Sequence, residues 1–84
     1  KQNAKIVEST SFAEVLHRCT SSKGISVRRV AQAPFFVLRG AAMPAVLLEM
    51  GYITNSSEAK LLSNSSYQQK LASAIADGIE SYLR

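Results

Sequence analysis

Hydrophobic residues recur at helical spacing in the first quarter of the chain. The apolar positions are Phe12, Val15, Leu16 and Cys19. Steps of three and four residues of this kind are typical of an amphipathic helix, here over residues 11–20. The hydroxyls of Ser9–Ser11 are suited to cap its start, and Glu14 completes a capping box with Ser11. Gly24 can adopt the left-handed conformation that ends a helix.

Two further helices are predicted near the C-terminal end of the chain. Asn55 can cap the first of them with Glu58 at its third position, ahead of an apolar side at residues 59–62. The second is capped near Ser65 or Ser66. Its apolar stripe consists of Leu71, Ile75, Ile79, Tyr82 and Leu83. Gly78 lowers the helix propensity here, so a close packing neighbour is expected beside it.

The middle of the chain carries two brief apolar runs, at residues 35–38 and 45–48, after a connector at 25–33. Both runs are typical of strands that are buried on both faces. The join between them is too short for a parallel crossover, so they are antiparallel neighbours or pair with strands outside this chain. A sheet of two strands is too small to be stable by itself. The pattern therefore predicts part of a larger α/β sheet with helices around it.

Composition limits the possible functions. The chain has 84 residues, with 46% hydrophobic and 19% charged residues, which is typical of a single small folded domain. One cysteine excludes an internal disulfide, and one histidine is too few for a His/Cys zinc cluster. The longest apolar run, at 41–48, is too short for a transmembrane segment, and residues 1–8 do not resemble a signal peptide. The charge of +4 is scattered, so we expect no nucleic-acid partner.

Glu49 is the residue that the hydrophobic pattern does not explain. It ends the apolar run 45–48, and in α/β sheets reacting groups gather beyond the carboxyl ends of strands. A carboxylate at that point is suited to general acid–base catalysis. Alternatively, it forms an ion pair with Arg39 or points to solvent. Arg39 is itself a candidate for orienting an anionic substrate group or for a structural partner of Glu49.

Other polar and aromatic residues are interpreted structurally. His17 lacks companion ligands and is expected at the surface. Cys19 lies on the apolar side of its helix and is expected to be a buried, inert thiol. Tyr52 and Tyr82 are interpreted as aromatic residues at the edge of the core. No phosphate loop, serine elbow or HExxH motif is present.

The chain resembles the end of the zinc-dependent N-acetylmuramoyl-L-alanine amidases, a family of cell-wall hydrolases. The similarity is carried by the segments 31–39, 43–55, 58–62, 67–68 and 75–79, with weaker similarity at 11–13. The resemblance implies that residues 1–84 are the C-terminal part of one amidase catalytic domain, with a fold that is the C-terminal portion of a single-domain mixed α/β sheet flanked by helices. It implies that the zinc-ligand half of that domain is missing from this chain.

The resemblance also implies a reaction, the cleavage of the amide bond between N-acetylmuramic acid and L-alanine in peptidoglycan. Zn²⁺ would polarise the amide carbonyl and lower the pKa of its bound water, and Glu49 would act as the general base and acid. The family's zinc ligands, two histidines and a glutamate, match no position here, so no metal ligand is assigned and His17 is not promoted to one.

The resemblance also implies partners, a location and a role. The partners are peptidoglycan and the missing N-terminal half, the location is periplasmic or extracellular, and the role is that of an autolysin. The fragment would be inactive alone. The alternative is a noncatalytic remnant that binds cell-wall material or another protein.

Overall fold

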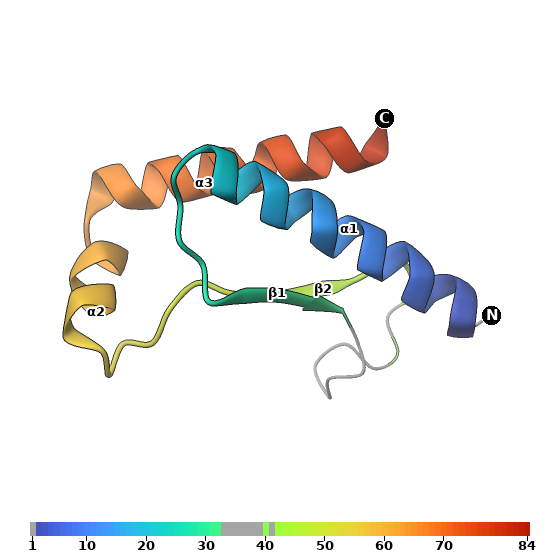
Figure 1. Cartoon of the computed structure of the whole chain (residues 1–84), viewed down its shortest axis with the longest axis horizontal. Coiled ribbons are helices and arrows are strands. Elements are labelled where there is room, and N and C mark those ends of the chain that lie inside the picture. The colour runs from blue at the N-terminus through green and yellow to red at the C-terminus, as the bar shows by residue number, and fades with distance from the viewer. Residues whose placement is uncertain (1, 33–39, 41) are drawn as a thin grey trace.

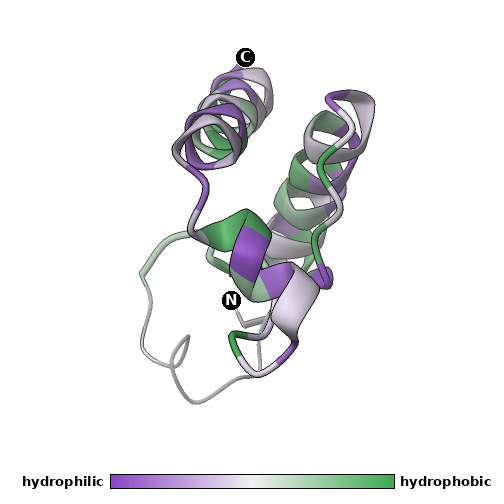
Figure 2. Ribbon diagram, turned by 90° about the vertical axis from the view of Figure 1, so that its left-hand side faces the viewer, coloured by the Kyte–Doolittle hydropathy of each residue, from purple (hydrophilic) through white to green (hydrophobic). Residues whose placement is uncertain are grey.

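The computed structural model describes residues 2–32, 40 and 42–84, so the strand expected at 35–38 lies outside the described residues. The elements are α1 (Gln2–Ser22), β1 (Arg29–Gln32), β2 (Val46–Glu49), α2 (Ser56–Leu62) and α3 (Ser65–Leu83). Helices α1 and α3 lie side by side (Figure 2) and run in opposite directions, and the sheet lies below α1 (Figure 1). The α/β class is confirmed. None of the described helices has the length and apolar character needed to cross a membrane.

Helix α1 starts earlier than the sequence pattern predicts. It begins at Gln2, so Ser9 and Ser11 lie inside the helix and the predicted capping box at Ser11 is wrong. The reason lies in the tertiary structure. Ser9 is buried, and its hydroxyl accepts a hydrogen bond of 2.9 Å from the backbone N–H of Ala45, just before β2. The hydroxyl that resembled a helix cap therefore ties α1 to the sheet.

The end of α1 agrees with the prediction. Gly24 has φ of 74°, in the left-handed region that favours glycine. The backbone N–H of Gly24 donates to Ser21 O at 3.0 Å, and that of Ile25 donates to Thr20 O at 2.9 Å, which together form a Schellman motif. Ile25 is then buried against α3. The turn therefore both stops the helix and begins the core.

The two described strands pair in antiparallel orientation, with Arg29 opposite Glu49 and Val30 opposite Leu48. β2 confirms the predicted strand to within one residue. β1, by contrast, lies where a connector was predicted, because Arg29 and Gln32 interrupt the apolar pattern. All four residues of β2 are half-buried, and among the described helices α1 makes the main contacts with the sheet.

The contact between α1 and α3 depends on small residues. Leu16 of α1 is only 2% exposed, and a Cβ atom on Gly78 would lie 2.5 Å from its Cδ2. This is the close neighbour that the sequence predicted for Gly78. Ala74 is fully buried beside Leu71. Small side chains at 74 and 78 therefore let the helices approach closely, whereas Ile79 and Leu83, which were expected on the buried stripe, are exposed.

Asparagine side chains cap both C-terminal helices. Asn55 accepts a hydrogen bond from the backbone N–H of Glu58 at 3.0 Å, as predicted. Asn64 does the same for Tyr67 at 2.8 Å, so the start of α3 was predicted one or two residues too late. The four polar residues at 63–66 all suit a cap, and the sequence pattern alone does not choose among them.

Candidate functional site

Glu49 lies at the end of β2, on the side of the sheet that leads into the loop at 50–55. Its side chain is 24% exposed, so the carboxylate is partly sheltered yet accessible. Its backbone carbonyl accepts a hydrogen bond of 2.7 Å from the backbone N–H of Arg28. This hydrogen bond, next to the pairing of β1 with β2, therefore fixes the backbone carbonyl of Glu49.

The Glu49 carboxylate forms an ion pair across the strands. Its Oε2 lies 2.9 Å from Nε of Arg29, the residue opposite it in the antiparallel register. From the sequence, the alternative role predicted for Glu49 was an ion pair with Arg39. That residue lies outside the described residues, and the arginine present beside Glu49 comes from β1. Sequence reasoning missed Arg29 because it did not predict β1.

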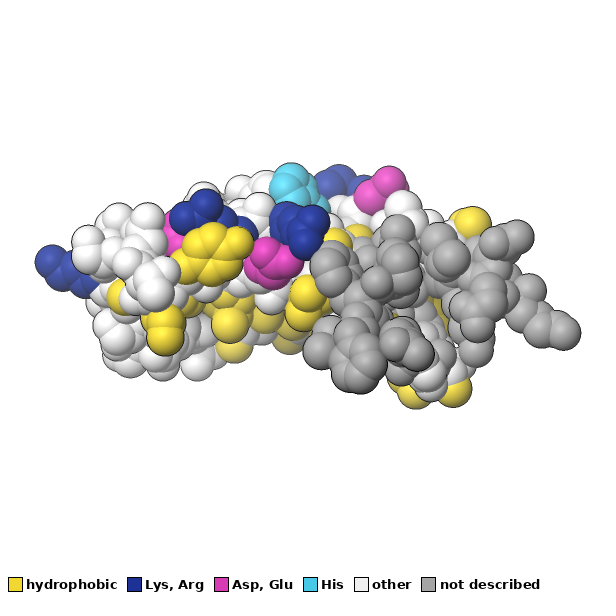
Figure 3. Space-filling model, turned by 90° about the horizontal axis from the view of Figure 1, so that it is seen from below, with side chains coloured by type: hydrophobic (Ala, Val, Ile, Leu, Met, Phe, Trp, Pro, Cys, Tyr) yellow, Lys and Arg dark blue, Asp and Glu magenta, His cyan; other side chains and the backbone are white. Residues whose placement is uncertain are grey.

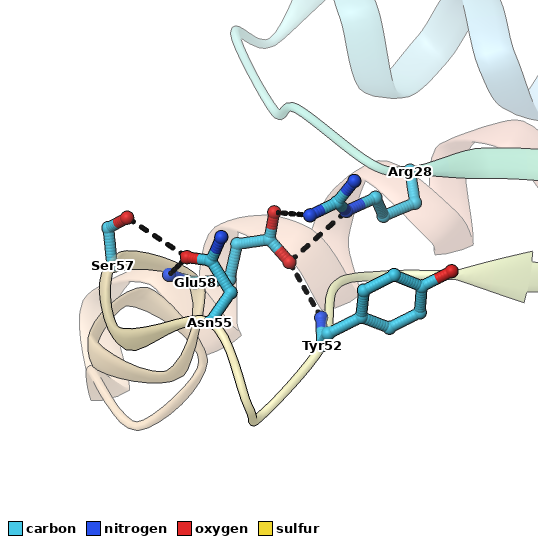
Figure 4. Close-up of polar contacts among 5 residues, drawn as sticks. All are labelled: Arg28, Tyr52, Asn55, Ser57 and Glu58. Atoms are coloured by element: carbon cyan, nitrogen blue, oxygen red, sulfur yellow. Dashed lines mark hydrogen bonds and ion pairs between the residues drawn. The ribbon is translucent and has the colours of Figure 1, made fainter.

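A second polar cluster consists of Arg28, Tyr52 and Glu58. Nη2 of Arg28 lies 2.6 Å from Oε2 of Glu58, and its guanidinium stacks 4.6 Å from the centre of the Tyr52 ring. The Tyr52 backbone N–H donates to Oε1 of Glu58 at 2.7 Å (Figure 4). The pKa of Glu58 is held below its usual range, first by that backbone hydrogen bond and then by the hydrogen bond and charge of Arg28. The cluster thus stabilises the ionised carboxylate.

Of the two tyrosines expected at the edge of the core, only Tyr82 lies there. Tyr82 is half-buried and stacks on Phe12, with ring centres 4.7 Å apart, as expected for the edge of the core. Tyr52 is 51% exposed, and its ring contacts Arg28 instead of the core. The core-edge expectation is therefore wrong for Tyr52. Its neighbour Ile53 is 82% exposed, so the loop after Glu49 presents apolar side chains to solvent.

His17 is exposed on α1, as predicted, and Cys19 is half-buried rather than fully buried. Over residues 2–32, 40 and 42–84, no three His, Cys, Asp or Glu side chains come together in a way that could hold a metal ion. The described residues therefore do not by themselves fit a zinc ion.

Figure 3 shows the molecule from the side of the sheet. Among the described residues, exposed hydrophobic side chains lie there beside basic and acidic ones. Next to Glu49, Met50 contributes to an apolar groove of about 370 Å³ between α2 and α3. Leu62, Tyr67, Leu71 and Ile75 are among the other residues that line this groove. Glu49 therefore lies at a border between charged and apolar surface.

These features define a class of protein, an α/β unit that carries an acidic residue at the end of a strand. The sequence pattern that describes the N-acetylmuramoyl-L-alanine amidases matches residues 1–81. That match covers nearly the whole chain, so the chain belongs to the N-acetylmuramoyl-L-alanine amidase family.

Individual relatives agree with this assignment. The N-acetylmuramoyl-L-alanine amidase AmiA of Escherichia coli (strain K12) is 46% identical over 73 residues, which are 87% of this chain and 25% of AmiA. The N-acetylmuramoyl-L-alanine amidase LytC of Bacillus subtilis (strain 168) is 38% identical over 71 residues, 84% of this chain and 14% of LytC. YqiI, an uncharacterized protein of the same Bacillus strain, is 43% identical over 70 residues, 83% of this chain and 34% of YqiI.

The chain thus spans between 14% and 34% of the length of these three relatives. No solved structure matches it significantly.

Proposed function

We propose that residues 1–84 are the C-terminal part of one amidase catalytic domain, and that this domain hydrolyses the amide bond between N-acetylmuramic acid and L-alanine in peptidoglycan. Membership of the amidase family supports the class of reaction. The observation that carries the role of this chain is the position of Glu49, which ends β2 with its backbone fixed by Arg28 and its carboxylate paired with Arg29.

Glu49 is the catalytic residue in this proposal. A carboxylate that is 24% exposed can reach a water molecule, and its contact with Arg29 fixes where it lies at the end of β2. Glu49 would take the proton of the water that attacks the amide carbonyl. It would then return this proton to the departing alanine nitrogen. The carboxylate is regenerated, so one residue serves as base and then as acid.

The remaining parts of the proposal lie outside the described residues. Zn²⁺ would be held by ligands elsewhere in the domain, in its N-terminal half. Arg39 is proposed to contact an anionic group of the stem peptide. Peptidoglycan would be the substrate, which would put the protein in the periplasm or outside the cell.

The test is the substitution Glu49→Gln in the complete domain. We expect peptidoglycan hydrolysis, measured as dye release from labelled cell walls, to fall at least about 10²-fold because no general base remains. Zinc content and the circular dichroism spectrum should stay unchanged. Glu14→Gln, at an exposed position on α1, is the matched control and should retain activity.

Near-normal hydrolysis by the Glu49→Gln protein would contradict the proposal. Metal-independent binding to cell walls without any hydrolysis by the unsubstituted protein would also contradict it, and would favour a noncatalytic role in cell-wall or protein binding. Because the proposed reaction depends on Zn²⁺, chelation of the metal should abolish hydrolysis.

A further inference from the structure

Glu58 makes an unusual use of its position in helix α2. A glutamate at the third position of a helix usually reaches back to the backbone N–H of the capping residue. Here that group, the N–H of Asn55, already donates to the Tyr52 carbonyl at 3.0 Å. The Glu58 carboxylate extends further instead and accepts a hydrogen bond of 2.7 Å from the backbone N–H of Tyr52 (Figure 4). Asn55 thus caps α2 while Glu58 is directed at the loop.

Arg28 occupies the other side of the Glu58 carboxylate. Its Nη2 lies 2.6 Å from Oε2, and its Nε donates to Oε1 at 3.2 Å. The guanidinium also lies over the Tyr52 ring, with 4.6 Å to the ring centre. Both charged groups of the pair therefore contact Tyr52, one through its backbone and the other through its ring.

Arg28 also reaches Glu49 through its own backbone. Its N–H donates to the carbonyl of Glu49 at 2.7 Å. The short segment 49–52 is consequently held at both ends, at Glu49 by the Arg28 backbone and at Tyr52 by Glu58. The ion pair between Arg28 and Glu58 closes the ring of contacts between these two ends.

A comparable ion pair elsewhere in the molecule lacks this arrangement. Lys23 and Asp77 are 3.0 Å apart and join the end of α1 to α3, with exposed fractions of 38% and 50%. Partly exposed pairs of this kind contribute little to stability. The two pairs differ in what they touch, because only the pair of Arg28 and Glu58 contacts the segment that follows Glu49. Its distinctive effect is therefore geometric.

We propose that Arg28 and Glu58 are positioning residues that hold the segment 49–52 and so fix where the Glu49 carboxylate sits. The inference rests on the proposed catalytic role of Glu49. Neither residue touches the reacting atoms in this proposal. A displacement of about 1 Å in a catalytic group can cost about 10²-fold in rate, so loss of the pair lowers turnover while substrate binding is retained.

The experiment compares three variants of the complete domain. Glu58→Ala removes both the ion pair and the acceptor for the Tyr52 N–H, whereas Glu58→Gln keeps an acceptor oxygen. Asp77→Ala removes the control pair with Lys23. We measure kcat and KM on soluble peptidoglycan fragments, thermal unfolding, and hydrogen exchange of the Tyr52 amide at a fixed pH.

Glu58→Ala is expected to lower kcat about 10-fold to 10²-fold with KM changed less than about 3-fold, and to speed exchange of the Tyr52 amide. Glu58→Gln should recover most of both losses. Asp77→Ala should leave kcat and the Tyr52 amide unchanged. The rescue by glutamine and the separation of kcat from KM would not be produced by a general loss of stability.

Unchanged kcat in Glu58→Ala, or an equal fall in Asp77→Ala, would overturn the inference while leaving the role of Glu49 intact. If Glu49→Gln itself proved active, the proposed function would fail, and exchange of the Tyr52 amide would still report whether Glu58 holds the segment. Should Glu58→Ala not fold, Arg28→Lys decides the matter. This variant keeps the charge but loses the planar fork, so a lower kcat at unchanged unfolding temperature supports the inference and an unchanged kcat overturns it.

Discussion

The helical layer, formed by α1 and α3, and the sheet-and-loop region, formed by β1, β2 and residues 50–58, are stabilised in different ways. Where α1 meets α3, Leu16 is buried against Gly78, which has no side chain, and Ala74 is fully buried. In the sheet-and-loop region, every residue of β2 is half-buried and Ile53 in the following loop is largely exposed. Polar contacts dominate there, chiefly those of Glu49 with Arg29 and of Glu58 with Arg28.

This difference separates the region that mainly stabilises the fold from the region in which we propose the chemistry. Close packing of apolar groups supplies most of the stabilisation of a fold, whereas partly exposed ion pairs supply little. The polar contacts of the sheet-and-loop region therefore matter mainly for geometry around Glu49. Substitutions in the helical layer should change the free energy of unfolding, and substitutions around Glu49 should change activity.

The largest effect on stability is expected from Leu16→Ala. Removing a side chain that is 2% exposed leaves a cavity between α1 and α3, which should lower the free energy of unfolding by about 2–5 kcal/mol. Leu83→Ala, at a position 75% exposed on α3, is the control and should cost less than about 0.5 kcal/mol. Urea denaturation of the protein measures both. Equal losses at the two positions would show that burial between α1 and α3 is not what stabilises the helical layer.

Gly78→Val tests the same contact by adding atoms. A Cβ atom there would lie 2.5 Å from Leu16 Cδ2, so the helices must move apart or Leu16 must leave its position. Overpacking of this kind should lower the free energy of unfolding by about 1–3 kcal/mol. Ala76→Val, exposed on the same helix, should cost no more than about 0.7 kcal/mol from helix propensity. A stable Gly78→Val protein would mean that the contact is looser than the structure indicates.

The ends and contacts of the helices were predicted better from the sequence than the pairing of the strands. Gly24, Asn55 and Gly78 each have a local physical reason to be where they are, and the structure confirms all three. The start of α1 was missed because the Ser9 hydroxyl bonds to Ala45, a contact across 36 positions that no local pattern reveals. The stripe on α3 was shifted because small residues, rather than large ones, mark the closest helix contact.

The candidate site was predictable only in part. Glu49 stood out because it is an acid at the end of an apolar run, but its partner Arg29 depends on a strand whose residues alternate poorly in polarity. Glu58 was read as part of a helix cap, and its contact with Tyr52 arises because the cap N–H is already occupied. Residue type locates a candidate acid, whereas strand register decides which cation meets it.

The smallest expected effect is the dependence of stability on pH at Glu58, and it sharpens the comparison between the regions. The pKa of Glu58 is lowered in the folded protein, first by the Tyr52 backbone hydrogen bond and then by Arg28. A carboxyl with a lowered folded pKa stabilises the fold fully above its unfolded value of about 4.3, and loses that contribution as the pH falls through the folded value.

The unsubstituted protein should therefore be more stable than Glu58→Gln at neutral pH, and this advantage should shrink as the pH falls below about 5. Other acidic groups titrate in both proteins, so the difference between their unfolding free energies isolates Glu58. Urea denaturation at a series of pH values measures it. An advantage that grew on acidification would show that Glu58 is stabilised in its protonated form, in conflict with its hydrogen bond from Tyr52 and its pairing with Arg28. Because the Glu58 side chain is partly exposed, its contribution to the free energy of unfolding should stay well below that of Leu16. A small contribution agrees with the proposal that the polar cluster mainly fixes the geometry around Glu49.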